Sequence, residues 1–296
     1  MQPRSFLIAL SRLRQTRLRL LAVAVAALGL AGCGLGLVYP RLDTVVGFYL
    51  EGLVTLDPAQ SVQLERVLAG NLEWHRRSEL ERYSAFLREL AGDVEGGAGP
   101  EDWRQAAQRA EQYWRDVFEQ AAPGYAALAA TFTDAQAAEL LANLERRDAE
   151  ERREHESRSP AERDARREKS VRRALERFTG PLTAEQRALV RAHVAASPSF
   201  VPEWLDNRRV WREALADALE RRDRRAEFEA RMRVLVARPD ELWTPRYRAA
   251  VEQRMAALVE LMAGLDATLT PAQRAEARRE LLALAEEVQG LARRRG

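Results

Sequence analysis

The chain has 296 residues, and its 47 lysine and arginine residues nearly balance its 45 aspartate and glutamate residues, giving a formal net charge of +2. The first 32 residues hold five of the arginines and no acid, so residues 33–296 carry 42 basic and 45 acidic groups, a net of −3. A mildly acidic body argues against a nucleic-acid-binding protein, which needs a basic surface to neutralise phosphates. Only one apolar run approaches the length of a membrane span, which argues against a polytopic membrane protein.

The composition is that of a folded protein. Hydrophobic residues make up 46% of the chain and charged residues 31%, so a chain of this length can bury a sizeable core. The single cysteine, Cys33, excludes an intramolecular disulfide and any metal cluster built on cysteines.

The N-terminus combines a basic stretch with an apolar run. An arginine-rich, acid-free stretch precedes an apolar run that ends in Leu30-Ala31-Gly32-Cys33. This tetrapeptide resembles the lipobox of bacterial lipoproteins, in which small residues before the cysteine fit the peptidase. The resemblance implies that residues 1–32 are removed and that Cys33 receives a diacylglycerol and an N-acyl chain, which together anchor a protein firmly. The alternative is a plain transmembrane helix over residues 20–39, which its four glycines weaken.

Residues 33–55 are predicted to form the lipidated N-terminus, a tether and a short apolar helix. Gly34 follows the cysteine, and the absence of an aspartate there favours the outer membrane by the sorting rule of lipoproteins. The side chains between Val45 and Val54 are mostly too apolar to remain in water. We therefore expect this segment to dock on the helical domain of residues 56–296 or to touch lipid.

Four places in that domain share a pattern that predicts a helix start. A leucine or phenylalanine precedes an N-cap residue, and a glutamine follows the cap three positions later. The cap accepts a hydrogen bond from a free backbone N–H, and the glutamine reaches back to the cap, which forms a capping box. The cap and glutamine positions are Asp57 and Gln60, Thr133 and Gln136, Thr183 and Gln186, and Thr270 and Gln273.

The first of these starts opens a long amphipathic helix over about residues 57–93, because apolar residues recur there at steps of three and four. If unbroken, this helix would be about 54 Å long. A second helix begins near Glu101, and we expect the Pro123-Gly124 pair to interrupt it.

Residues 145–177 are the most charged part of the chain, with 12 basic and 10 acidic residues among 33. Acidic residues precede basic ones at a spacing of four, which supports solvated helices. Ser159-Pro160 divides the segment into two helices. We expect a solvated helical arm here, and the alternative is an interaction surface.

The remaining chain predicts helices at 183–196 and 203–237, a turn at Arg238-Pro239-Asp240, and helices at about 245–264 and 270–294. The apolar stripes of the last two predict a terminal hairpin in which they face each other. No alternating run of β-branched residues and no Asn-Gly or Asp-Gly turn is present. The predicted fold is all-α with no sheet, an elongated bundle or hairpin array of long amphipathic helices.

The sequence carries no recognisable catalytic constellation. It lacks a His-Glu-x-x-His pair, a Gly-x-Ser-x-Gly elbow and a glycine-rich phosphate loop. We predict no metal site, and no cofactor beyond the acyl chains on Cys33. The one candidate interaction patch is Trp74-His75-Arg76-Arg77, for which the alternative is a plain amphipathic helix with one buried ring and solvated arginines.

Several motifs together resemble the DUF6279 family, uncharacterised lipoproteins of Gram-negative bacteria. In chain order they are Tyr39, Phe48-Tyr49-Leu50, the helix start from Leu56 to Gln60, Trp74-His75-Arg76 followed by Leu80 and Tyr83, Ser159-Pro160-Ala161-Glu162-Arg163, Leu182 to Gln186, and Ala195-Ala196-Ser197-Pro198 followed by Trp204. Pro40 stands where the family usually has asparagine after the first tyrosine. The resemblance implies a class and a location but no reaction. The Leu-Thr-x-x-Gln starts are also similar to those of small helical periplasmic chaperones.

We therefore expect a non-enzymatic interaction or scaffold protein on the periplasmic face of the outer membrane. Its partners would be membrane lipid, through Cys33, and an envelope protein or glycan, with no nucleic acid. One alternative is a periplasmic holdase, which requires an exposed apolar concave face. The other is a hydrolase of envelope polymers, which requires a convergent carboxylate pair in a cleft.

Overall fold

The computed structural model describes Gly36 and residues 39–293. Leu30, Ala31, Gly32 and Cys33, with the rest of the predicted signal peptide, lie outside the described residues. The described residues form eleven α-helices and two short 3-10 helices and contain no strand, which confirms the all-α prediction. In chain order the elements are η1 (Tyr39–Arg41), α4 (Leu42–Glu51), α5 (Pro58–Ser78), α6 (Leu80–Gly96), α7 (Pro100–Ala129), α8 (Asp134–Glu156), α9 (Pro160–Thr179), α10 (Ala184–Ala196), α11 (Val201–Glu220), α12 (Arg225–Ala237), η2 (Pro239–Leu242), α13 (Pro245–Thr268) and α14 (Pro271–Arg293).

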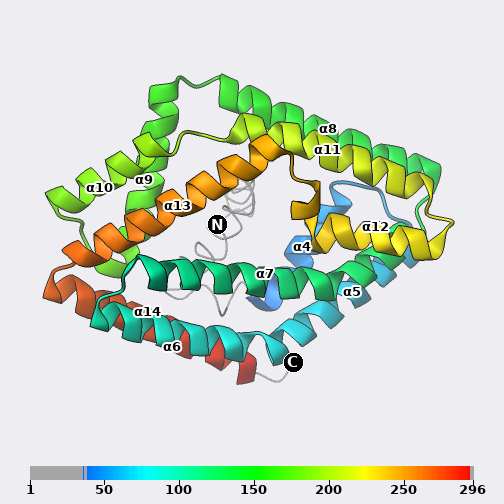
Figure 1. The fold of residues 1–296 in the computed structure, drawn as a ribbon. Coiled ribbons are helices and arrows are strands. Elements are labelled where there is room, and N and C mark those ends of the chain that lie inside the picture. Colours follow the sequence, from blue (N-terminus) through cyan, green and yellow to red (C-terminus); the bar gives the residue numbers. More distant parts are fainter. Residues whose placement is uncertain (1–35, 37–38, 294–296) are drawn as a thin grey trace, which may run out of the picture.

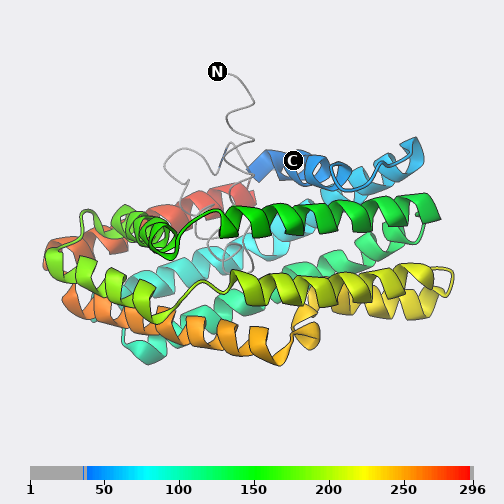
Figure 2. The ribbon, with the colours of Figure 1, turned by 90° about the horizontal axis from the view of Figure 1, so that it is seen from above.

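The helices pack side by side in pairs. Helices α6 and α14 form one edge of the molecule and α8 and α11 form the opposite edge, with α7 and α13 between them (Figure 1). Seen from above, most helices run along one direction, so the body is longer than it is thick (Figure 2). None of the described helices combines the length and the apolar character that crossing a bilayer requires.

Three apolar clusters hold these helices together. The largest joins the α4–α5 hairpin to α7, α8, α11 and α12 through residues such as Leu68, Phe132 and Phe228. The second lies mainly between α6 and α14, and the third between α10 and α13. Because every helix buries one apolar stripe in such a cluster, the amphipathic pattern of the sequence accounts for the helical content.

The long helix predicted over residues 57–93 is interrupted at Glu79. Backbone hydrogen bonds continue across the junction, from Glu79 N to His75 O and from Tyr83 N to Glu79 O, both 2.9 Å. The junction is therefore a bend, and it lets α5 pack on α4 and α7 while α6 packs on α14. An apolar periodicity carries no signal for such a change of partner, so the unbroken helix was the wrong prediction.

The predicted interruption at Pro123-Gly124 is wrong for the opposite reason, because α7 continues through it to Ala129. Gly124 lies against α5 so closely that a Cβ there would come within 2.7 Å of Cγ1 of Val67. Packing between α7 and its neighbours α5 and α12 thus outweighs the local penalty of an internal proline.

Two predictions about the C-terminal half are also wrong. The helix predicted over 203–237 breaks at residues 221–224, where the side chain of Arg222 donates to the carbonyls of Leu219 and Phe132 at 2.7 Å each. The predicted terminal hairpin does not form either, because α14 packs on α6 and α9 while α13 packs on α10 and α7. The sequence shows that both helices have an apolar stripe, but not which helix covers it.

Candidate functional site

The candidate patch Trp74-His75-Arg76-Arg77 occupies the last turn of α5, just before the bend into α6. Arg77 is exposed, whereas the other three residues are half-buried. The ring of His75 is used inside the protein, since its Nδ1 lies 2.9 Å from the hydroxyl oxygen of the buried Tyr39. The patch therefore fastens the beginning of the described chain to the helical body.

The hydrogen bond between Tyr39 and His75 joins two neutral groups. Burial lowers the pKa of His75 to about 4, so its ring is uncharged at neutral pH. Burial also raises the pKa of the Tyr39 hydroxyl above its ordinary range, despite the opposing effect of Arg76. The two residues form a dry, neutral contact that is suited to holding a segment in place.

Aromatic rings continue this contact between the helices. The ring of His75 lies 5.4 Å from that of Tyr83, which lies 5.0 Å from that of Tyr113 on α7. Phe86 follows at 5.7 Å from Tyr113. Contacts of this kind add to the free energy of apolar burial, so the row stabilises the α5–α6 bend against α7.

Glu79 is a residue of this site that the sequence does not single out. It is only 1% exposed, and Nη1 of Arg82 binds both of its carboxylate oxygens, at 2.8 and 2.9 Å. The same guanidinium nitrogen lies 2.9 Å from the carboxylate of Asp116 on α7. This network satisfies a buried charge at the bend between α5 and α6. None of its three residues lines either of the two cavities described below.

The four predicted capping boxes all form, with a side-chain oxygen of each cap accepting from the backbone N–H of its glutamine. The glutamines also bind each other in pairs, which the sequence does not predict. We call these pairs the first glutamine clasp (Asp57, Gln60, Thr133 and Gln136) and the second glutamine clasp (Thr183, Gln186, Thr270 and Gln273).

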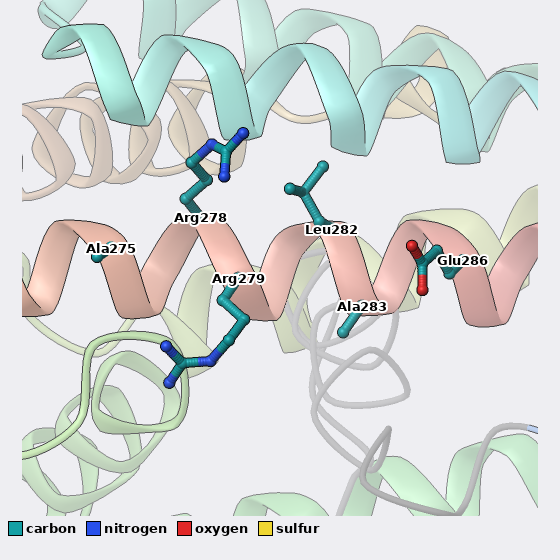
Figure 3. A pocket seen from close by; sticks show the side chains of 6 residues that line it. All are labelled: Ala275, Arg278, Arg279, Leu282, Ala283 and Glu286. Carbon is teal, nitrogen blue, oxygen red and sulfur yellow. The ribbon is translucent and has the colours of Figure 1, made fainter.

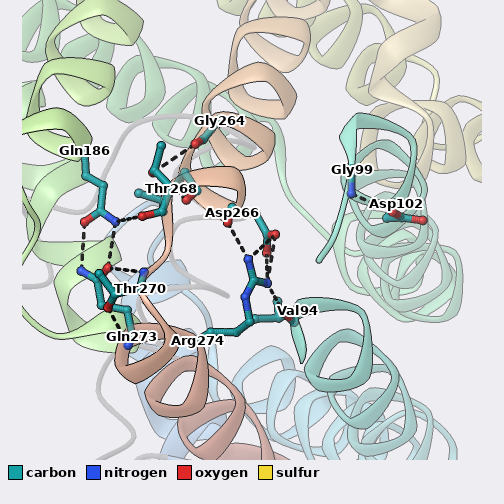
Figure 4. Close-up of polar contacts among 11 residues, drawn as sticks. Val94, Gly99, Asp102, Gln186, Gly264, Asp266, Thr268, Thr270, Gln273 and Arg274 are labelled. Atoms are coloured by element: carbon teal, nitrogen blue, oxygen red, sulfur yellow. Dashed lines mark hydrogen bonds and ion pairs between the residues drawn. The ribbon is translucent and has the colours of Figure 1, made fainter. Parts of the chain in front are cut away.

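Each clasp is a reciprocal amide pair. In the first glutamine clasp, Gln60 Nε2 donates to Gln136 Oε1 at 3.1 Å, and Gln136 Nε2 donates to Gln60 Oε1 at 2.6 Å. In the second glutamine clasp the equivalent distances between Gln186 and Gln273 are 2.8 and 2.9 Å (Figure 4). The clasps therefore join helix starts that lie 76 and 87 residues apart.

The chain that leads into each helix is bound as well. Every glutamine Nε2 also donates to the carbonyl two residues before its partner's cap, with distances from 2.8 to 3.0 Å. These acceptors are Thr131 for Gln60, Thr55 for Gln136, Thr268 for Gln186 and Pro181 for Gln273. One side chain thus satisfies its own helix start and the loop before another.

Most of the helices described above lie in a segment that matches a known family. A model of DUF6279, described as a family of unknown function, matches residues 52–248, about two-thirds of the chain. The chain belongs to this family. No curated protein and no solved structure matches it.

The DUF6279 match contains one complete clasp and half of the other. The first glutamine clasp lies wholly inside residues 52–248, whereas Gln273 of the second lies outside them. Tyr39 and the whole of α14 also lie outside, although α14 packs on α6 and Tyr39 on His75. In this DUF6279 protein the matched segment is thus completed structurally by the chain on both sides of it.

The charged segment predicted as a solvated arm is packed along its neighbours. Helix α8 lies beside α11, and α9 lies beside α10 and α14. Asp148 is 8% exposed and binds two arginines of α11, Arg208 at 2.9 Å and Arg212. The division at Ser159-Pro160 is confirmed, because Ser159 caps α9 in a capping box with Glu162.

The cavities of this DUF6279 protein gather few chemical groups. The larger, about 410 Å³, is open and is lined only by residues of α14, among them Arg278, Arg279 and Glu286 (Figure 3). Arg278 and Arg279 already bind Glu95 and Glu276. No group of three or more histidine, cysteine, aspartate or glutamate side chains in the described part of the chain is placed to hold a metal ion. A smaller cavity, of about 100 Å³, lies beside Arg254.

Proposed function

We propose that this DUF6279 protein is a non-enzymatic scaffold or interaction protein, held on the periplasmic face of the outer membrane by acyl chains on Cys33. The observation that carries the proposal is the short distance along the chain between that cysteine and a buried contact. Tyr39, which is fastened to His75, comes only six positions after Cys33. Six residues extend at most about 20 Å, so the lipid would hold the start of the helical body close to the bilayer.

The α4–α5 hairpin fits a place next to lipid. Its aromatic side chains Phe48 and Tyr49 are 64% and 47% exposed, and Val62 on α5 is 43% exposed. These are the large hydrophobic side chains that the described surface leaves exposed. Aromatic rings are favoured at the boundary between membrane and water, so they would add to the hold of the acyl chains.

A scaffold role is supported by the kind of surface that the helices present elsewhere. Ion pairs between different helices tie exposed side chains together, such as those of Glu119 with Arg233 at 2.6 Å and with Arg238 at 2.8 Å. A surface of this kind is suited to a polar partner, such as an envelope protein or a glycan. A holdase would present a broad apolar face, and a hydrolase a convergent carboxylate pair.

The anchor is tested by moving the cysteine. The full chain, expressed in a Gram-negative host with labelled palmitate, should be labelled and should fractionate with the outer membrane. The Cys33→Ser variant should stay unlabelled and uncleaved. The double variant Cys33→Ser/Gly34→Cys keeps one thiol but shifts it by one residue, and it should also stay unlabelled. Labelling of either variant would refute lipidation at the lipobox.

The scaffold role is tested in intact cells. A photo-cross-linking residue at exposed positions of the body, such as Arg209 and Arg225, should capture the same envelope protein or glycan in repeated experiments. The matched control is the Cys33→Ser chain, which should lose that neighbour if anchoring brings the two together. Absence of any reproducible neighbour in the anchored chain would contradict the scaffold role and leave the anchor unaffected.

A further inference from the structure

A small cavity lies where the joint between α10 and α11 meets α13. Its volume is about 100 Å³, and its walls include Ser197, Ser199, Phe200 and Arg254. A water molecule occupies about 30 Å³ in the liquid, so the cavity has room for a small polyatomic group. Its lining includes an arginine without an acidic partner, whereas Arg278 and Arg279 of the larger cavity are both ion-paired.

Arg254 is that arginine. Its guanidinium lies 4.9 Å from the centre of the Phe200 ring, and it makes no ion pair or hydrogen bond with any residue that the structure describes. Burial lowers its pKa to about 10, and the neighbouring Arg167 adds to the effect. Cations that are withdrawn from water are ordinarily paired with an acid, so the half-buried Arg254 lacks its expected partner.

Arg167 reaches the same joint from α9. Its side chain is 17% exposed, and it donates to the carbonyl of Ser197 and, at 3.2 Å, to the Ser197 hydroxyl. Asp164 compensates it only from the side, at 3.2 Å, and the buried Nε has no hydrogen-bond partner. The two arginines thus add their positive potentials at the Ser197 turn.

The other titratable groups near the cavity do not neutralise the positive charge of Arg254 and Arg167. Glu203 lines the wall but pairs with Arg246 at 2.9 Å. His193 on α10 has a pKa lowered by burial and by both Arg254 and Arg167, and its Nδ1 lies 3.1 Å from the carbonyl of Ala257. It is therefore neutral at pH 7, and the cavity keeps a net positive character.

We propose that this cavity binds a phosphate group, with Arg254 as the residue that donates to its oxygens and Arg167 as the second cation behind the Ser197 turn. A phosphate carries close to two negative charges at neutral pH, which matches two arginines. The planar fork of a guanidinium also fits two phosphate oxygens at once. Ser199 and Phe200 also line the cavity.

Calorimetric titration of the full chain, purified in detergent, with inorganic phosphate tests the proposal. Chloride at the same ionic strength serves as the reference. We expect Arg254→Gln to weaken phosphate binding at least about tenfold, because one charge-assisted contact is lost. Arg167→Gln should weaken it less. The control Arg225→Gln makes the same chemical change at an exposed arginine of α12 and should bind phosphate like the unaltered chain.

Thermal unfolding separates binding from a structural role. Phosphate should raise the melting temperature of the unaltered chain but not that of Arg254→Gln. In chloride alone, Arg254→Gln should melt no lower than the unaltered chain, because it removes a half-buried charge that has no acidic partner. A lower melting temperature in chloride, combined with unchanged phosphate binding, would overturn the proposal.

The source of the phosphate is distinguished by two further probes. Binding of soluble glycerol phosphate would indicate a free phosphate ester. Retention on vesicles that contain phosphatidate, lost in Arg254→Gln, would indicate a lipid headgroup. Acetate binding as tightly as phosphate would refute a phosphate site, since a carboxylate brings only one charge.

Discussion

The two glutamine clasps have nearly the same hydrogen bonds but different surroundings. In the second glutamine clasp Gln186 is fully buried and Gln273 is 8% exposed, whereas in the first only Gln60, at 4%, is buried and Gln136 is half-buried. The ion pair beside the second clasp, Arg274 with Asp266 at 3.0 Å, is buried at Asp266 (Figure 4). The ion pair beside the first, Arg222 with Asp134, has an exposed carboxylate.

Because of this difference in burial, hydrogen bonds of the same geometry should contribute unequally to the free energy of unfolding. A hydrogen bond that water can replace contributes little, whereas the same bond in a buried site leaves unsatisfied groups when it is lost. The second glutamine clasp should therefore contribute more to the free energy of unfolding than the first. Because it holds α14, which lies outside the DUF6279 match, it also fastens the end of the chain to the family segment.

The largest expected effect is that of Gln186→Leu. Leucine has a similar volume but removes the bonds of Gln186 to the Thr183 N–H and the Thr268 carbonyl. It also removes both reciprocal bonds to the buried Gln273 amide, which keeps only its bonds to Pro181 and to its own helix start. We expect a loss of about 3 kcal/mol in the free energy of unfolding, measured by urea denaturation. The double variant Gln186→Leu/Gln273→Leu should cost clearly less than the sum of the two single changes, because both amides are then absent. Simple additivity would contradict a reciprocal clasp.

Acid should affect differently the helices that begin at the two clasps, α5 and α10, since each carries a half-buried histidine with a lowered pKa. Burial lowers the pKa of His75 to about 4 from an ordinary value of 6.5, so the unfolded chain takes up a proton that the folded chain does not. This contribution to stability is complete above pH 6.5 and is lost as the pH falls towards 4, and about 2.5 kcal/mol of it is lost by pH 4.5. His193 shifts in the same direction.

Urea midpoints between pH 7.5 and 4.5 measure this effect. His75→Gln should flatten the pH dependence, and His193→Gln should flatten it less. His155→Gln is the control, because its ring is the least buried of the three. An unchanged slope in His75→Gln would show that the ring takes up its proton without loss of the fold.

The sequence predicts the local structure of this protein far better than it predicts which helices and residues come together. All four capping boxes could be predicted, because a cap and its glutamine are three residues apart and their bonds are local. The reciprocal glutamine bonds could not, since they join residues 76 and 87 positions apart. The terminal hairpin failed for the same reason, because the stripes of α13 and α14 are covered by other helices.

The candidate site follows the same rule. Trp74-His75-Arg76-Arg77 stands out as a motif, and Tyr39 as an aromatic residue, but only the fold brings Tyr39 to His75. Glu79 is one acid among many in the sequence, and its burial depends on the bend between α5 and α6. Arg254 is likewise one arginine among 46, and only its missing partner in the fold marks it.

The substitution Gln136→Leu tests the first glutamine clasp in the same way. It removes the same reciprocal bond and the same bond to a loop carbonyl, that of Thr55, as Gln186→Leu does in the second clasp. Because Gln136 is half-buried, water can reach the groups that it leaves. We expect a loss of about 1 kcal/mol in urea denaturation, and a loss equal to that of Gln186→Leu would show that burial does not distinguish the clasps.

The smallest expected effects are those of the threonine caps, and they should be equal. In both clasps the threonine hydroxyl accepts from the backbone N–H of its glutamine at 3.2 Å, and both Thr133 and Thr183 are exposed. Thr133→Ala and Thr183→Ala should therefore each cost about 0.5 kcal/mol in urea denaturation, the low end for an exposed cap. If the two threonine variants lose equal free energy of unfolding while the two glutamine variants lose unequal amounts, the difference between the clasps lies in the buried amide pair. Unequal cap costs would instead locate the difference in the helix starts themselves, because the two cap bonds have the same length and both threonines are exposed.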